Sequence, residues 1–285
     1  MRHLRIFSLA LLAGMLLLAS TACAKLKARD HINQGAAAFK SARYSDAVEH
    51  FKLAMELDPQ LPTAHQYLAI SYMVQWIPGA ESPENLAVLE KARTEFDKLL
   101  VKDPNDRTSL AYMAYMAYNQ AASLPAEQKL AKYDEATKTY LRLIATDPES
   151  KENREAFYTM GVIAYNRWKP ALMLARSNLR MRVEDPGPIK DKKVKEALRT
   201  EYSAVIQGGI DNLDKALSID PEYDEAMAYK NLMIRTRADL LDGSDEYTRQ
   251  IKDADDWLQK ALDTKKMKVA RQEKSAAGGI INDVK

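Results

Sequence analysis

The chain has 285 residues, of which 46% are hydrophobic and 29% are charged, and this is enough apolar material for the core of one elongated domain. Residues 1–22 contain two arginines and no acidic residue, so the rest of the chain carries 40 basic and 40 acidic residues. A chain balanced in this way lacks the positive field that nucleic-acid binding requires, and nucleic acid is therefore excluded as a partner.

The first segment, residues 1–22, predicts an export signal. Arg2 and Arg5 provide a basic start, residues 6–19 form an apolar core, and small residues follow. The apolar core has only 14 residues, which is too short to cross a bilayer comfortably. The segment therefore directs the protein out of the bacterial cytoplasm.

Two ways of processing this signal are open. Cleavage after Ala24 fits an ordinary signal peptidase site. Alternatively, the sequence from Ser20 to Cys23 resembles the bacterial lipobox, in which Cys23 is lipidated and becomes the first mature residue. Both interpretations predict a periplasmic protein of the bacterial cell envelope, and the second adds membrane attachment through Cys23.

The residue after the cysteine is Ala24 and not the Asp associated with inner-membrane retention, which favours the outer membrane. Cys23 is the only cysteine in the sequence, so no disulfide forms within the chain.

The segment from Tyr44 to Pro59 predicts an amphipathic helix with a defined end. Its apolar residues recur at helical spacing and include two small ones, Ala47 and Ala54, where a neighbouring helix can approach closely. Asp58-Pro59 ends the helix, because proline lacks an amide hydrogen and disfavours helical geometry in the residue before it.

This pattern is repeated along the chain. The spacing of Ala47, Phe51 and Pro59 recurs in three later copies, and a fifth copy lacks the proline: Ala92, Phe96, Pro104; Ala136, Tyr140, Pro148; Gly209, Leu213, Pro221; Ala254, Leu258. The prolines are 45, 44 and 73 residues apart. Self-similarity at such a period indicates helical units that bury their apolar faces against their neighbours.

These copies resemble the tetratricopeptide repeat (TPR) family in Tyr44/Ala47 and Tyr133/Ala136, in the aromatic residue four positions later, and in the Asp-Pro that follows. The resemblance implies an all-α fold, a right-handed α-solenoid of stacked helix-turn-helix repeats. We expect a repeat domain over residues 23–263 with five repeats, at 28–61, 62–105, 106–150, 151–222 and 223–263. Ser82-Pro83 predicts a helix start inside the second repeat.

The fourth repeat is longer than the others and predicts an inserted helical arm over residues 169–200. The arm has nine basic and four acidic residues, a local charge of +5. We expect a solvated hairpin that packs over the repeats; a contact with anionic lipid headgroups or an acidic partner is the alternative. Residues 264–285 are basic at first and then contain paired glycines, which predicts a partly disordered tail.

No arrangement of residues in the sequence predicts catalysis. His31 and His65 occupy equivalent positions of adjacent repeats, where packing is expected, and no further ligands complete a metal site with them or with His50. Nucleophile patterns and glycine-rich phosphate loops are absent from the sequence. We therefore expect a protein that is not an enzyme and that carries no cofactor and no metal.

Tyrosines on the first helices of the repeats are the candidate binding residues. In the TPR family the first helix of each repeat lines the concave face, so the resemblance implies that this face carries Tyr67, Tyr112, Tyr115, Tyr118, Tyr158, Tyr165 and Tyr229. Aromatic residues with a polar tip suit binding surfaces. The predicted function is a cell-envelope scaffold that binds protein or peptide segments in this groove. The alternative is an accessory that binds a solute or glycan for an envelope transport or polysaccharide system.

Overall fold

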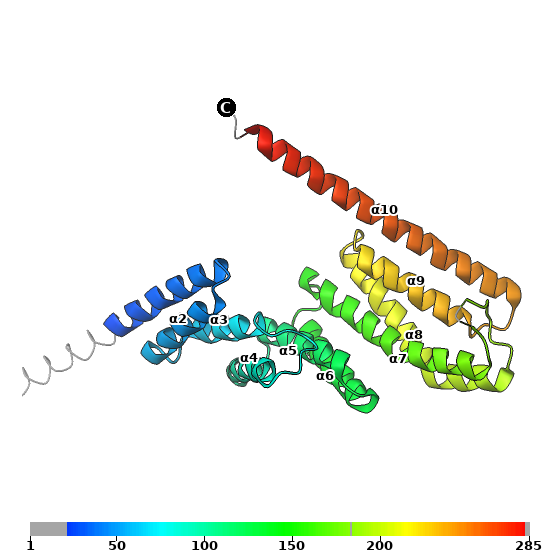
Figure 1. The fold of residues 1–285 in the computed structure, drawn as a ribbon, viewed down its shortest axis with the longest axis horizontal. Helices are drawn as coiled ribbons and strands as arrows, with labels where there is room; N and C mark the ends of the chain where they lie inside the picture. The colour runs from blue at the N-terminus through cyan, green and yellow to red at the C-terminus, as the bar shows by residue number, and fades with distance from the viewer. Residues whose placement is uncertain (1–21, 183, 283–285) are drawn as a thin grey trace, which may run out of the picture. The chain divides into compact units, whose positions relative to one another are not determined.

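The computed structural model describes residues 22–182 and 184–282, so most of the predicted signal segment lies outside the described residues. All regular secondary structure in the described residues is helical (Figure 1), which confirms the predicted all-α class. The chain divides within one helix into two compact units, residues up to Thr139 and residues from Tyr140 onward. Each unit is a set of TPR-like helix pairs, and each is described by itself.

The first described helix of unit 1 covers residues 22–40. The helices that follow it are α2 (Tyr44–Leu57), α3 (Pro62–Met73), α4 (Pro83–Lys102) and α5 (Arg107–Gln120), a short 3-10 turn η1 (Ala121–Ser123), and the first part of α6 (Ala126–Thr146). Consecutive helices pack together, α2 with α3, α3 with α4 and α4 with α5. This is the helix-turn-helix succession that the repeat pattern predicts.

The helix ends follow the local sequence. Helices α2, α4 and α6 end at Leu57, Lys102 and Thr146, each directly before an Asp-Pro pair. Helix α4 begins as predicted, because the Ser82 side chain accepts a hydrogen bond from the Asn85 amide and Pro83 fills the first helical position. Short-range chemistry therefore sets these boundaries.

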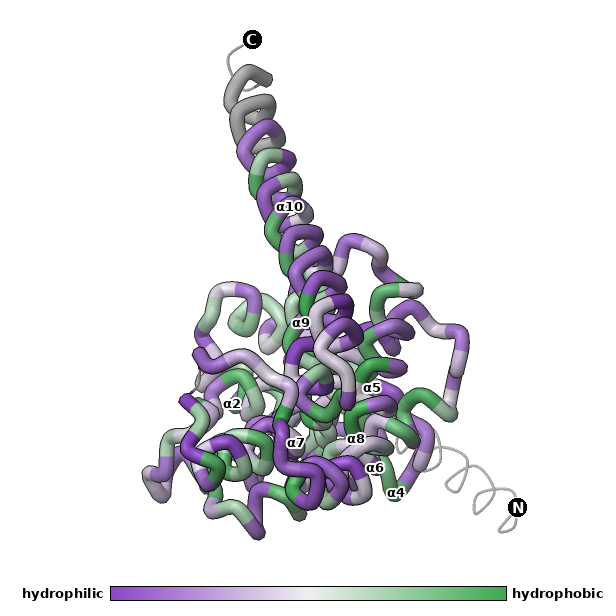
Figure 2. The backbone as a smooth tube through the Cα atoms, turned by 90° about the vertical axis from the view of Figure 1, so that its right-hand side faces the viewer, coloured by the Kyte–Doolittle hydropathy of each residue, from purple (hydrophilic) through white to green (hydrophobic). Residues whose placement is uncertain are grey.

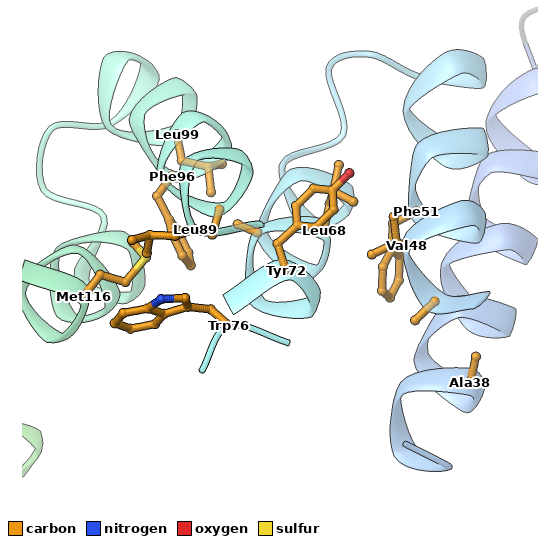
Figure 3. Close-up of a cluster of buried hydrophobic side chains, with 13 residues drawn as sticks. Ala38, Val48, Phe51, Leu68, Tyr72, Trp76, Leu89, Phe96, Leu99 and Met116 are labelled. Atoms are coloured by element: carbon orange, nitrogen blue, oxygen red, sulfur yellow. The ribbon is translucent and has the colours of Figure 1, made fainter. Parts of the chain in front are cut away.

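The core of unit 1 is built from the repeated positions. Ala47, Ala92, Phe51 and Phe96 are fully buried. Figure 3 shows Phe51 of α2 directed at α3. Leu89 and Phe96 belong to α4, and Trp76, which follows α3, lies beside Met116 of α5. Burial of such side chains contributes about 1.5–3 kcal/mol each. The small alanines let the helices approach, and the aromatic rings fill the space between them.

Unit 2 contains the end of α6, the 3-10 turn η2 (Lys151–Asn153), and four helices: α7 (Arg154–Asn178), α8 (Lys192–Ile219), α9 (Asp224–Ala238) and α10 (Ser244–Asn282). Helices α7 and α8, α8 and α9, and α9 and α10 pack side by side (Figure 1). Helix α8 ends at Ile219, again directly before Asp-Pro.

The segment predicted as a separate arm, residues 169–200, is continuous with the helices of unit 2. Helix α7 runs through Pro170 to Asn178, and α8 already begins at Lys192. Leu172 and Ile189 in this segment are fully buried. The segment is a helical hairpin with mostly exposed or half-buried side chains, as expected, but it does not lie over the repeats, because it lengthens two repeat helices and has core residues of its own.

Two glycines allow α7 and α8 to approach closely. A Cβ atom on Gly209 would lie 2.6 Å from the Ala164 Cβ and 2.6 Å from the Met233 Cε, and one on Gly161 would lie 2.6 Å from the Leu213 Cγ. Glycine at these two positions therefore brings the two backbones together where a larger side chain would clash.

Helix α10 lacks an Asp-Pro pair and continues to Asn282, where the sequence predicted a partly disordered tail from residue 264. Thr264 is buried against α9, the Lys268 ammonium pairs with Asp224, and Arg271 pairs with Glu222. The start of the predicted tail is thus held by α9 and the turn before it.

Figure 2 shows mostly hydrophilic residues, with scattered hydrophobic ones, along α10. Among the described helices, none combines the length and hydropathy of a membrane span.

Candidate functional site: the tyrosines of the first helices

Two tyrosines of unit 1 make the same contact in successive repeats. The Tyr67 ring stacks on Phe51 with a centroid distance of 5.4 Å and an interplanar angle of 27°. The Tyr112 ring stacks on Phe96 with 5.2 Å and 20°. In both pairs the tyrosine follows the phenylalanine by 16 residues, from the second helix of one repeat to the first helix of the next. One face of each tyrosine ring is therefore covered by a phenylalanine ring, and this contact holds the tyrosine in its orientation.

Unit 1 exposes two of the predicted site residues. Tyr67 on α3 is 39% exposed and Tyr115 on α5 is 42% exposed. Tyr112 is half-buried, and burial raises the pKa of its phenol. Tyr67 and Tyr115 are thus the tyrosines of this unit whose rings are open to a partner, and the stack on Phe51 holds the first of them in place.

Tyr118, the last predicted site residue of α5, lies against α6. Its ring is half-buried and faces Tyr133 of α6, with a centroid distance of 6.2 Å and an interplanar angle of 28°. Tyr133 itself is buried. The contact places Tyr118 at the packing surface between the two helices of the third repeat.

The predicted site residues of unit 2 form a cluster across α7 and α9. The Tyr229 ring meets Tyr158 at 5.7 Å and Tyr165 at 5.8 Å, edge to face in both cases. Tyr165 is buried, and the Lys169 ammonium lies 5.4 Å from its ring centroid. Burial is the main cause that raises the pKa of Tyr229, and nearby Tyr165 adds to it while Lys169 opposes it. Tyr158 and Tyr229 are half-buried, so this cluster offers less accessible ring surface than unit 1.

Sequence reasoning missed Tyr223, which completes this cluster. Its hydroxyl donates to the Glu155 carboxylate at 2.6 Å, and its ring lies 4.9 Å from that of Tyr158. The Arg154 guanidinium covers the ring at 4.6 Å. Burial, followed by the hydrogen bond to Glu155, raises the pKa of Tyr223 well above its usual value. The sequence signal was its place directly after the Asp-Pro-Glu that ends the fourth repeat.

The histidines lie at helix contacts. His65 Nδ1 is 2.9 Å from a Glu95 carboxylate oxygen, and its Nε2 is 3.2 Å from the Pro59 carbonyl oxygen. The His31 and His50 Nδ1 atoms are 3.3 Å apart between the helix over residues 22–40 and α2. Within the described part of the chain, no group of three His, Cys, Asp or Glu side chains is arranged to hold a metal ion.

Unit 2 contains three clefts. Their volumes are about 650, 300 and 640 Å³, and they are lined by residues 179–207 and 237–242. None of the seven predicted tyrosines lines any of the three. These clefts therefore do not provide the tyrosine-lined pocket that the solute-binding alternative predicts.

Cys23 lies in the helix described over residues 22–40, and its side chain is an exposed free thiol. The part of the predicted signal that precedes it, residues 1–21, lies outside the described residues. The structure leaves the sulfur accessible for modification, and lipidation stays a prediction.

No family model matches the chain, and no curated protein matches it. Solved structures that are similar to it include MamA from Desulfovibrio magneticus RS-1, at 17% identity and a TM-score of 0.49, covering 85% of this chain and 96% of that one. A thermophilic TPR protein of Thermus thermophilus is 14% identical with a TM-score of 0.45, covering 85% of this chain and 97% of that one. The TPR-like assignment therefore rests on the repeat pattern and on the helix pairs that carry it.

Proposed function

We propose that the protein is a non-catalytic scaffold that binds an extended segment of a partner protein through the first helices of its repeats. The observation that supports this most directly is the pair of exposed rings, Tyr67 and Tyr115, on the first helices of two successive repeats. Exposed aromatic rings are costly to leave in water, and they are enriched at the centres of protein interfaces.

The stack of Tyr67 on Phe51 supports a binding role, because it orients the exposed ring before a partner arrives. A ring that is already held loses little conformational entropy on binding, so more of the contact energy contributes to affinity. Tyr112 on Phe96 repeats the arrangement one repeat later, with its ring more buried. We assign Tyr112 to support of the surface and Tyr67 and Tyr115 to direct contact.

The second part of the proposal is that Cys23 carries a lipid that holds the scaffold at the bacterial envelope, with the outer membrane as its destination. It is supported by the basic and apolar start of the sequence, by the lipobox-like residues before Cys23, and by the exposure of the thiol. The partner is then an envelope protein.

Affinity capture from envelope extracts with the tagged protein, followed by mass spectrometry and by calorimetric titration with the purified candidate, tests the binding role. We expect saturable binding of a protein segment to the folded scaffold. Calorimetric binding of a sugar or organic acid, with no protein partner that titrates, would favour the solute-binding alternative and contradict the proposal.

A further inference from the structure

Unit 2 contains a basic cleft that none of the predicted site tyrosines lines. It has a volume of about 650 Å³ and is lined by one face of α8 together with the segment before it and the turn between α9 and α10. The residues from α8 are Lys192, Lys195, Glu196 and Arg199, whose spacing places them on one side of the helix. The cleft therefore collects positive charge from a continuous helix face.

The lining carries four cationic side chains, since Lys190 also contributes, against the two carboxylates of Glu196 and Asp242. Lys190 and Lys192 are exposed, and within the described part of the chain neither has an ion pair. The cleft lining thus has two more positive than negative charges.

The other two cations of the lining hold an exposed carboxylate. The Lys195 ammonium, on a side chain that is only 7% exposed, lies 2.8 Å from one Asp242 oxygen, and the Arg199 guanidinium lies 2.9 Å from the other. The Asp242 side chain itself is 73% exposed. Backbone carbonyls fix both cations in place: Lys195 donates to Leu241 at 3.0 Å and Arg199 Nε donates to Leu240 at 2.8 Å.

We propose that this cleft binds a phosphate group, and that the Asp242 carboxylate occupies the anion position when no ligand is bound. A ligand with a single carboxylate would only exchange with Asp242 and gain nothing. A phosphate compound with several charges replaces Asp242 on Lys195 and Arg199 and also neutralises Lys190 and Lys192. Arginine binds phosphate through its planar fork and lysine binds it as a point charge, so this mixture of cations suits the ligand.

The α8 N-terminus is not the source of this site. The Asp191 side chain already accepts hydrogen bonds from the Lys193 and Val194 amides. The proposed recognition is therefore carried by side chains, and charge substitutions in the cleft address it directly.

The test is calorimetric titration of the full chain carrying Cys23→Ser with inorganic pyrophosphate, and sedimentation of the same protein with phosphatidylglycerol or phosphatidylcholine vesicles. We expect Lys192→Glu to weaken binding by about tenfold. Lys193→Glu is the matched control, because it changes the same charge one position away on a residue that does not line the cleft. Asp242→Asn removes the internal anion and is expected to strengthen binding.

Pyrophosphate binding that is strengthened by Asp242→Asn and weakened by Lys192→Glu more than by Lys193→Glu supports the proposal, with a soluble phosphate compound as the ligand. Binding only to phosphatidylglycerol vesicles, with the same order of variants, supports it with a lipid headgroup as the source of the phosphate. No binding in either arm, or equal effects of Lys192→Glu and Lys193→Glu, would overturn it. Melting curves of each variant show that the fold is kept.

Discussion

Arg176 and Asp239 form a buried ion pair between the last turns of α7 and the end of α9, 63 residues apart in the sequence, with 2.8 Å between Nη1 and Oδ2. Burial raises the pKa of the Asp239 carboxyl, and the Arg176 guanidinium opposes that rise. Arg176 also donates to the Arg182 carbonyl at 2.9 Å. The pair thus joins three segments of unit 2 and makes residues 169–200 part of its core.

We predict that Arg176→Met lowers the free energy of unfolding by about 3–5 kcal/mol, because it leaves the Asp239 carboxylate buried without a partner. The double variant Arg176→Met/Asp239→Asn removes both charges and is expected to lose less than the sum of the two single variants. Denaturant unfolding of all three measures the coupling. A loss below about 1 kcal/mol for Arg176→Met would show that the pair behaves like an exposed one.

Gly208 and Gly209 provide a matched pair on α8. We predict that Gly209→Ala lowers the free energy of unfolding by about 1–3 kcal/mol through overpacking against Ala164 and Met233. Gly208→Ala meets nothing within 4 Å and is expected to raise it by about 0.5–1 kcal/mol, because alanine favours a helix. Chemical denaturation compares the two, and equal effects at both positions would show that α7 and α8 do not depend on the close approach.

The phenol of Tyr223 should resist ionisation. Burial and its hydrogen bond to Glu155 raise its pKa in the folded state, so unfolded chains lose this proton near pH 10 while folded ones keep it. Stability contributed by Tyr223 is therefore fully present below about pH 10 and is lost as the pH rises above it.

An ultraviolet titration of tyrosinate in the folded protein measures this behaviour. We expect Tyr223→Phe to leave the amplitude of the reversible alkaline phase unchanged, since Tyr223 does not take part in it. An amplitude that falls by one tyrosine would mean that this phenol ionises normally.

The sequence determined the helix ends and the buried stripe, because both depend on short-range chemistry. An Asp-Pro pair directly follows α2, α4, α6 and α8, and Ala47 and Ala92 were identified as contact positions from periodicity alone. Pro170 lies at the start of the segment predicted as an arm, yet α7 continues through it, since packing of Leu172 and Arg176 in unit 2 outweighs the local cost. That packing depends on residues far away in the chain.

The candidate site was predicted only in part, for a similar reason. Spacing placed the tyrosines on the first helices of the repeats, but the exposure of each ring depends on its neighbours. Tyr165 is buried beside Tyr229, whereas Tyr115 is 42% exposed. A signal for the stacked pairs was present in the sequence, because phenylalanine and tyrosine recur 16 residues apart at Phe51 and Tyr67 and again at Phe96 and Tyr112.

Lipidation of Cys23 predicts where the protein is found in the cell. We expect the wild-type protein to sediment with membranes and to resist extraction by salt, and Cys23→Ser to release it or to block its processing. Fractionation of cells that express each form measures this. Recovery of an unmodified mature N-terminus at Lys25 would contradict the lipid anchor and support cleavage after Ala24.

The binding role of the first helices depends most directly on Tyr67 and Tyr115. Calorimetric affinity for the captured partner is to be compared among Tyr67→Ala, Tyr115→Ala and Leu53→Ala, the last being a control that is 40% exposed on the second helix of the first repeat. We predict that Tyr67→Ala and Tyr115→Ala each weaken binding by about 1–3 kcal/mol, as aromatic hot spots do, and that Leu53→Ala leaves it unchanged. Unchanged affinity in both tyrosine variants, with intact melting curves, would contradict the proposed binding surface.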